Sequence, residues 1–162
     1  MIRDIQSADA EMVAKLVSQH FGSDRVVSRG VLHYARELPG WLLEGDTAPA
    51  GVLCYHLVDS DCEVVILIAS PSGQGNGGRL LQHLYEWAEH QRINRLWLVT
   101  TNDNEGAISF YRQQGWKLKA VHADAVDEAR KLKPEIPLVN DHDQPISDEW
   151  EFEYQLHSNE GF

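Results

Sequence analysis

The sequence predicts a single-domain α/β (α+β) protein with about seven strands and about four helices. Short apolar segments of two different periodicities follow one another along the 162 residues, without repeats or low-complexity tracts. This length, with 43% hydrophobic residues, is enough for one core without metal or disulfide staples. No apolar run approaches the ~20 residues of a membrane span, and the polar start at Met1–Ile5 is unlike a signal peptide. We therefore expect a cytoplasmic protein that does not enter a membrane.

The first half of the chain is expected to alternate between helices and strands. Residues 2–6 form a short strand, and Ser7 precedes an apolar stripe that predicts a helix capped by this serine. A second helix is expected over residues 28–37, before Pro39 and Gly40. Strands follow at 41–43, 51–57 and 63–69. The last of them, EVVILIA, is rich in β-branched residues and is expected to lie in the centre of the sheet.

The second half continues the alternation. A glycine-rich loop at residues 71–78 precedes a helix whose apolar face carries Leu80, Leu81 and Leu84. A buried strand is expected at 95–101, and Asn104 is expected to cap a short helix that ends at Gly115. Strands at 116–121 and 149–156 alternate like antiparallel ones. Between them lies a long segment, residues 122–148, with one helical piece near 126–132.

Charge and cysteine content exclude several classes of protein. The net charge is −11, and residues 121–153 hold ten acidic and three basic residues. Phosphate repels such a chain, so we expect no general binding to nucleic acid. Cys54 and Cys62 are expected to be free thiols in a reducing compartment, although a hairpin that placed them opposite each other would allow a bond. No Cys/His spacing predicts a metal site.

The glycine-rich loop is the strongest local signal for binding. Four glycines lie within six residues at a helix start, where free backbone N–H groups and the helix dipole favour an anion such as phosphate. The loop has neither the lysine of a Walker motif nor the Rossmann spacing. Taken alone, the loop favours an anion site, and the alternative is a flexible turn.

A second segment makes the interpretation specific. Asn104, Ala107, Phe110, Tyr111 and Gly115 fall in the pattern Asn-x-x-Ala-x-x-Phe-Tyr-x-x-x-Gly, followed by Trp116. With the glycine loop about thirty residues upstream, the chain resembles the GCN5-related N-acetyltransferase (GNAT) family. The family's Arg/Gln-x-x-Gly-x-Gly/Ala motif is matched by residues 72–77, with Ser72 in the first position. The likeness covers about residues 1–120 and returns at the last strand.

The resemblance implies a fold, a co-substrate and a set of binding residues. The sheet would be mixed and mostly antiparallel, with a V-shaped splay between strands 63–69 and 95–101. Acetyl-CoA would bind there, its pantetheine arm pairing with the backbone of Leu67, Ile68 and Ala69 like an added strand. A backbone N–H in that stretch would also hold the thioester oxygen. The expected cofactor-binding residues also include Gly73, Gln74, Gly75, Asn76, Gly77, Gly78, Arg79, Asn104 and Tyr111.

The resemblance also implies a reaction, transfer of an acetyl group to a primary amine by direct attack in a ternary complex. Tyr111 would protonate the departing CoA thiolate, since a phenol stays protonated at neutral pH. Glu63 is the first candidate for the general base, with His122 and His56 as alternatives. A non-catalytic sensor or scaffold that binds acyl-CoA is the alternative function.

The acceptor is expected to be a small-molecule or peptide amine. The family builds its acceptor pocket from early helices and the loop before the last strand, here Tyr34, His33 and Trp41 together with residues 141–150. An acidic loop there would favour a cationic amine. The domain is expected to span residues 1–156, with 122–148 as an acidic insertion and 157–162 as a flexible tail. The late strand and long loop leave a homodimer open.

Overall fold

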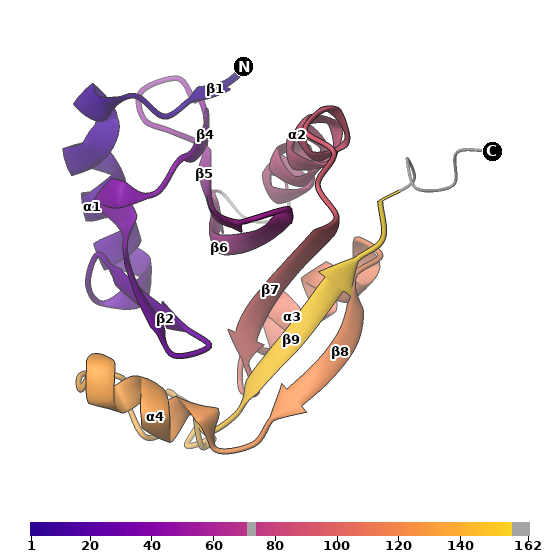
Figure 1. Ribbon diagram of the computed structural model, residues 1–162. Coiled ribbons are helices and arrows are strands. Elements are labelled where there is room, and N and C mark those ends of the chain that lie inside the picture. Colours follow the sequence, from indigo (N-terminus) through magenta and orange to yellow (C-terminus); the bar gives the residue numbers. More distant parts are fainter. Residues whose placement is uncertain (71–73, 157–162) are drawn as a thin grey trace.

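A twisted seven-stranded sheet forms the centre of the protein, in a computed structural model that describes residues 1–70 and 74–156 (Figure 1). Four α-helices accompany the sheet in the described part of the chain. In order across the sheet, the strands are β1 (Ile2–Asp4), β4 (Gly40–Leu43), β5 (Gly51–Val58), β6 (Asp61–Ala69), β7 (Arg95–Thr101), β9 (Glu149–Tyr154) and β8 (Lys117–His122). The helices are α1 (Ala10–Phe21), α2 (Asn76–His90), α3 (Glu105–Gln113) and α4 (Ala125–Leu132).

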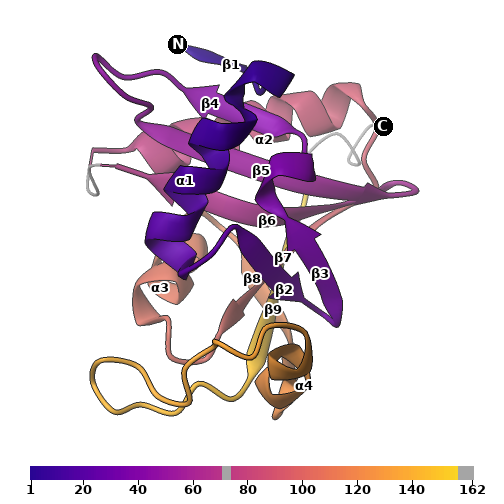
Figure 2. The same cartoon turned by 90° about the vertical axis from the view of Figure 1, so that its left-hand side faces the viewer.

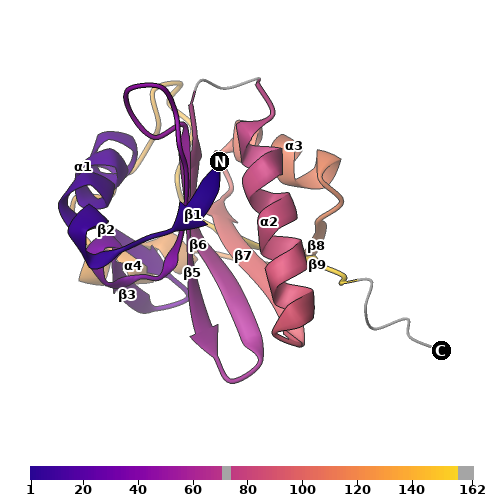
Figure 3. The ribbon, with the colours of Figure 1, turned by 90° about the horizontal axis from the view of Figure 1, so that it is seen from above.

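The sheet separates two layers with different covers. Helices α2 and α3 lie on one face, while α1, a small hairpin and α4 lie on the other (Figure 3). Each face has its own core, because alternate side chains of a strand point to opposite sides. The α2 face buries Leu81, Leu84 and Phe152, and the α1 face buries Val17 and Ile66. No helix among the described residues is long and apolar enough to cross a membrane.

The expected mixed, mostly antiparallel sheet is confirmed. Its one parallel pair, β6 with β7, joins Asp61–Glu63 to Arg95–Trp97 and no further residues. Beyond these three residues the two strands diverge, which is the expected splay. On its other side β7 pairs with β9 over its whole length, from Leu96 to Thr101. The splay therefore opens inside a sheet that is continuous on both sides of it.

The prediction of a helix over residues 28–37 is wrong. This part of the chain is an antiparallel hairpin of β2 (Arg25–Ser28) and β3 (Val31–Tyr34), followed by a single 3₁₀ turn, Ala35–Glu37. Arg29 and Gly30 form its two-residue turn with φ of 46° and 79°, the conformation that matches the twist of paired strands. Figure 2 shows the hairpin and α1 in front of β5 and β6.

The two cysteines do not meet. Cys54 pairs with Ile66 and Cys62 with Leu57 across the β5–β6 hairpin, and their side chains belong to the cores on opposite faces of the sheet. Both are buried and free.

The first helix also begins differently from the expectation. Gln6 precedes a 3₁₀ turn over Ser7–Asp9, and its backbone N–H donates to the Asp9 carboxylate at 2.7 Å.

Candidate active site

A cleft of about 640 Å³ runs along the splay, from the first turn of α3 to the far end of α1. Tyr111, Asn104 and Ala107 contribute its α3 wall, and Val65 and Leu67 of β6 line it from the other strand. Its opposite end is lined by Phe21, Val26, Lys133, Glu135, Ile136, Ile146 and Glu149, from α1, the hairpin, the insertion and β9. The insertion thus contributes a wall of this cleft.

The open edge of β6 carries free backbone groups. The Ser70 N–H donates to the Ala50 carbonyl at 2.8 Å, so residue 70 faces β5. Because alternate residues of an antiparallel strand direct their backbone groups to opposite edges, Ile68 also faces β5, whereas Leu67 and Ala69 face the splay. Of the three residues expected to pair with an extended ligand, the register therefore offers Leu67 and Ala69 and turns Ile68 away.

The glycine loop and the start of α3 lie at the same edge of the sheet, since each follows one of the two parallel strands. Gly75 precedes α2 in a left-handed conformation with φ of 77°, and no atom lies within 4 Å of the position a Cβ would occupy. The Arg79 side chain and Gln74 are exposed beside it. The first N–H groups of α2 have no acceptor within the helix, and such groups at a helix N-terminus favour an anion.

Packing explains two other residues of this loop. A Cβ on Gly77 would lie 3.0 Å from Cζ of Phe110, so this glycine lets α2 approach α3 closely. Asn76 is buried, and its amide donates to the Ser70 carbonyl at 3.4 Å, which ties the loop to the end of β6. Gly78 also lies against α3, next to the side chain of Gln114. Gly73 lies outside the described residues.

Tyr111 has one side in the core and the other in the cleft. Its ring packs edge-on against Phe110 and Trp116, with centroids 5.3 and 5.8 Å away, and it is 8% exposed. Burial raises the pKa of its phenol, so the hydroxyl stays protonated throughout the neutral range. Asn104 caps α3 as expected, accepting the Ala107 N–H at 3.2 Å, and its side chain also lines the cleft.

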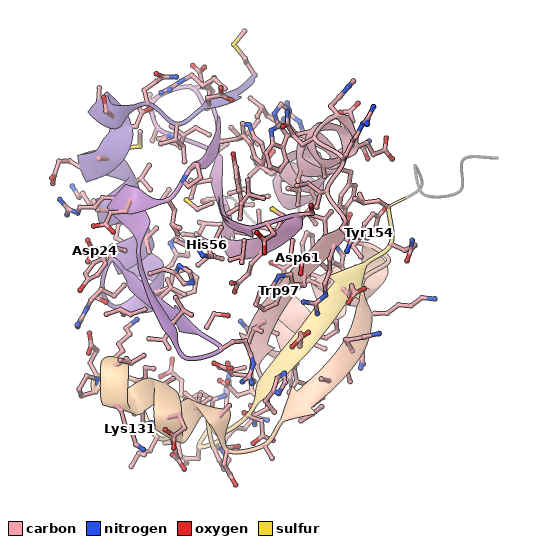
Figure 4. The ribbon with its side chains drawn as sticks, viewed as in Figure 1. Asp24, His56, Asp61, Trp97, Lys131 and Tyr154 are labelled. Atoms are coloured by element: carbon pink, nitrogen blue, oxygen red, sulfur yellow. The ribbon has the colours of Figure 1, made fainter. Side chains whose placement is uncertain are left out.

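Glu63 lies where the parallel pairing ends, on the face of the sheet that carries the hairpin. Glu63 is 4% exposed, and burial raises its pKa to about 7 against the opposing effect of the nearby Ser28 side chain. The imidazole Nε2 of His33 is 3.9 Å from Glu63 Oε1, and the His33 and His56 rings meet at 5.0 Å. Figure 4 labels His56 and Trp97, which come from β5 and β7 on either side of β6. The alternative base His122 instead contacts Glu151 at 2.8 Å.

Contacts made by Arg29 and Lys133 help to tie the hairpin to the C-terminal half of the molecule. The Arg29 guanidinium and backbone N–H both donate to Oε1 of the buried Glu149, at 2.9 and 3.3 Å. Lys133 is 6% exposed and donates to the carbonyls of Phe21 and Arg25, at 3.0 and 2.8 Å. These contacts hold β2 beside α4 at the far end of the cleft.

The residues expected to form the acceptor pocket do not lie together in the structure. His33 reaches Glu63, and Tyr34 is largely exposed. Trp41 lies on the opposite face of the sheet, where it packs against Tyr55, His83 and Trp87, because its place in β4 directs it to the α2 core. From the segment 141–150, Ile146 and Glu149 line the cleft, but the aspartates 141, 143 and 148 do not.

Comparison with known proteins identifies the architecture. Residues 9–116 match the model of the Acetyltransferase (GNAT) family. The chain belongs to this family. It is 34% identical over 140 residues to the uncharacterized protein YxbD of Bacillus subtilis (strain 168), covering 86% of this chain and 88% of that one.

Solved structures of GNAT proteins share the whole fold. An IAA acetyltransferase from Bacillus cereus ATCC 14579 superposes with a TM-score of 0.73 at 16% identity, over 96% of this chain and 99% of the other. A GNAT acetyltransferase from Elizabethkingia anophelis with acetyl-CoA bound gives a TM-score of 0.65 at 15% identity, over 96% and 97% of the two chains. The seven-stranded sheet with its splay is thus the GNAT fold.

Sequence reasoning missed Ser28, Arg29, Lys133 and Glu149. Ser28 and Arg29 fall in the segment expected to be a helix, and the turn between the two short strands lacks a standard hairpin pair such as Asn-Gly. Lys133 and Glu149 lie in or beside the acidic segment, where a charged side chain is ordinarily solvated. Their burial depends on contacts with residues more than one hundred positions away, which no local pattern indicates.

Proposed function

We propose that this GNAT protein transfers the acetyl group of acetyl-CoA to a primary amine by direct attack, with Glu63 as general base and Tyr111 as general acid. The observation that supports the proposal best is the single cleft that Tyr111 shares with the free edge of β6. Glu63 lies at the apex of the same splay. A donor and an acceptor that approach from opposite ends of this cleft would meet between the two side chains.

The donor would occupy the end of the cleft nearest α2 and α3. Backbone groups of Leu67 and Ala69 would pair with the pantetheine arm, and the first N–H groups of α2, which follow Gly75, would hold the pyrophosphate. Arg79 and Gln74 are exposed at the same place and would reach the phosphates from the side. Asn104 would bind the arm through the amide N–H₂ that its capping bond leaves free.

The acceptor must first lose a proton, because an ammonium group has no lone pair. Glu63 takes this proton, and its pKa of about 7 keeps it both largely ionised at slightly alkaline pH and basic enough to act. The amine then attacks the acetyl carbonyl, the C–N bond forms, and the C–S bond breaks with its electron pair going to sulfur. Tyr111 protonates that sulfur. The nitrogen then loses a second proton, which returns through solvent to the Tyr111 phenolate. The sum is an amide, free CoA and one proton released.

The acceptor end of the cleft is chiefly apolar. Its two carboxylates, Glu135 and Glu149, are each paired with an arginine, Arg25 and Arg29. Because both carboxylates are neutralised by these arginines, a cationic acceptor has no unpaired carboxylate to bind at this end of the cleft. The aspartates 141, 143 and 148 do not line the cleft. We therefore propose a primary amine attached to a small apolar group, either on a small molecule or at the end of a peptide.

The decisive test combines binding with turnover. Acetyl-CoA should raise the melting temperature of the protein, and thiol should be released when apolar primary amines are added. Tyr111→Phe should lower kcat strongly and leave the affinity for acetyl-CoA nearly unchanged. A thermal shift without thiol release for any of a broad set of amines would instead indicate an acyl-CoA sensor. Absence of any shift would refute both functions.

A further inference from the structure

Lys133 is a buried lysine in the wall of the cleft, where it is 6% exposed. Its Nζ donates to the backbone carbonyls of Phe21 and Arg25, at 3.0 and 2.8 Å. Glu135 is near enough to raise the pKa of Lys133, but this carboxylate forms its ion pair with Arg25 instead. An ammonium has three N–H donors, so one of them has no acceptor among the described residues. Because buried lysines are ordinarily paired with an anion, this one indicates that an anionic ligand binds beside it.

The carboxylates at this end of the cleft are already balanced. Each of the two is bound by an arginine, in the pairs Glu135–Arg25 and Glu149–Arg29. A third carboxylate of the cleft, that of Asp103, lies beside the start of α3. The acceptor end therefore has one uncompensated positive charge, that of Lys133, and this charge favours an anion there.

Strand β2 gives the distance between Lys133 and the proposed base. Lys133 binds the carbonyl of Arg25 at the start of this strand, and Ser28 at its end lies next to Glu63. Three residues of a strand span about 10 Å. With about 3 Å for each of two hydrogen bonds, about 4–7 Å remain between the polar ends of a molecule that reaches both groups, depending on the direction of the bonds.

The wall at this end of the cleft is apolar. It is formed by Phe21, Val26, Ile136 and Ile146. Such a wall suits the carbon chain of a ligand whose two ends are polar.

We propose that the acceptor has a carboxylate as well as its amine and that Lys133 binds this carboxylate. The inference rests on the proposed function, in which Glu63 takes the proton of the amine. The substrate would be an ω-amino acid or a short peptide, because about two to four methylene groups, or one peptide unit, span the distance between the two sites. Its ammonium would face Glu63, its carboxylate would face Lys133, and its carbon chain would lie along the apolar wall.

The first test compares acceptors that differ only in charge, in the thiol-release assay with the wild-type protein. 5-Aminopentanoate should have a kcat/KM about ten- to a hundredfold above that of 5-aminopentanamide, the effect of one hydrogen bond to a charged group. Alanylleucine and its C-terminal amide make the same comparison on a peptide. A preference for the acid in one pair alone distinguishes a free ω-amino acid from a peptide. An amide that is as good as the acid in both pairs would refute the inference.

The second test varies the length of the chain. Glycine, with one carbon between its amine and its carboxyl group, is too short to reach both sites, and 8-aminooctanoate is too long. Each should have a kcat/KM about tenfold or more below that of 5-aminopentanoate. An optimum at glycine would place the carboxylate next to Glu63 and would refute the assignment to Lys133.

The third test removes the ammonium. Lys133→Met should lower the preference for 5-aminopentanoate over its amide to within about threefold, with the KM for acetyl-CoA unchanged. Because both acceptors are measured on one preparation, their ratio does not depend on the fraction of folded protein, which separates acceptor binding from the structural role of the two carbonyl bonds. Lys131→Met, on the exposed side of α4, is the control and should keep the wild-type ratio.

The outcomes distinguish this inference from the proposed function. A wild-type ratio in Lys133→Met would refute Lys133 as the residue that binds the carboxylate. Acetylation of neutral amines without any preference for the acids would refute the inference and leave the proposed function standing. If no acceptor releases thiol, the proposed function fails and the carboxylate site fails with it.

Discussion

Replacing Glu63 by glutamine should stabilise this protein at pH 8 while it abolishes most of the activity. Burial raises the pKa of Glu63 to about 7, compared with 4.5 for an exposed glutamate. Because the folded-state pKa is the higher one, the folded protein holds this proton more tightly than the unfolded chain does. The free energy of unfolding is therefore highest below about pH 4.5, falls as the pH rises towards 7, and stays low above it.

The size of the effect follows from the two pKa values. A difference of about 2.5 units corresponds to about 3 kcal/mol, the penalty for keeping Glu63 ionised and buried above pH 7. Glutamine has nearly the same shape and no charge, so the variant lacks that penalty. Its advantage over wild type should be about 3 kcal/mol at pH 8 and below about 1 kcal/mol at pH 5. For a domain of this size that is a rise in Tm of roughly 6–12 °C at pH 8.

Urea denaturation at pH 5 and pH 8 measures the difference directly. Glu86→Gln, which removes an exposed carboxylate from α2, is the matched control and should differ from wild type by the same small amount at both pH values. A Glu63→Gln variant with the same advantage at both pH values, or less stable than wild type at pH 8, would refute a buried, raised-pKa carboxyl. Loss of thiol release in a variant that is more stable would show that Glu63 is kept for function rather than for folding.

Three further substitutions, two of them with a matched control, test other parts of the structure. Gly77→Ala should destabilise by about 1–2 kcal/mol, because its Cβ would crowd Phe110. Gly106→Ala, where nothing lies within 4 Å, should stabilise by about 0.5–1 kcal/mol, and equal effects of the two on Tm would contradict this packing. Asn104→Ala removes the cap of α3 and should lower the free energy of unfolding by about 1 kcal/mol. A loss of acetyl-CoA affinity in this variant beyond the loss of stability, measured by calorimetry, would show that Asn104 also binds the donor. Lys133→Met leaves the carbonyls of Phe21 and Arg25 without their buried donor and should destabilise by about 1–3 kcal/mol in urea, whereas Lys131→Met, on an outward-pointing side chain (Figure 4), should change stability by less than about 0.5 kcal/mol.

Most of the fold could be predicted because its signals are local. The β-branched run of β6, the glycines before α2 and the capping Asn104 each specify an element through neighbours a few residues away, and all three elements are found where expected. The hairpin was not predicted because its local signal is weak. Its strands have four residues each, too short for their period of two to outweigh the helical spacing of the same apolar residues.

The candidate site could be predicted only where it belongs to those local elements. Tyr111 and the α2 loop follow from the resemblance, and Tyr111 lines the cleft. The splay itself depends on a pairing that ends after Glu63 and Trp97, which are 34 positions apart in the chain. Trp41 shows the opposite case, since its aromatic ring suggested an acceptor pocket and its strand register placed it in the core behind the sheet.

The part of the site that the sequence conceals most is the surroundings of the base. Glu63 on an isolated strand is an ordinary exposed carboxylate, and only the hairpin that covers it removes water from it and raises its pKa. The same hairpin contributes Ser28 and His33, and its position depends on the bond between Arg29 and Glu149, which are 120 residues apart. A mutation in that distant pair should therefore act on catalysis through Glu63. The double variant Arg29→Ala/Glu149→Gln frees the hairpin tip without leaving an unpaired carboxylate near Glu63. It should admit water to the Glu63 carboxyl and move the acid limb of the activity profile below pH 7, while acetyl-CoA binding is unchanged. An unshifted acid limb in the folded double variant would mean that the hairpin covers Glu63 without this contact.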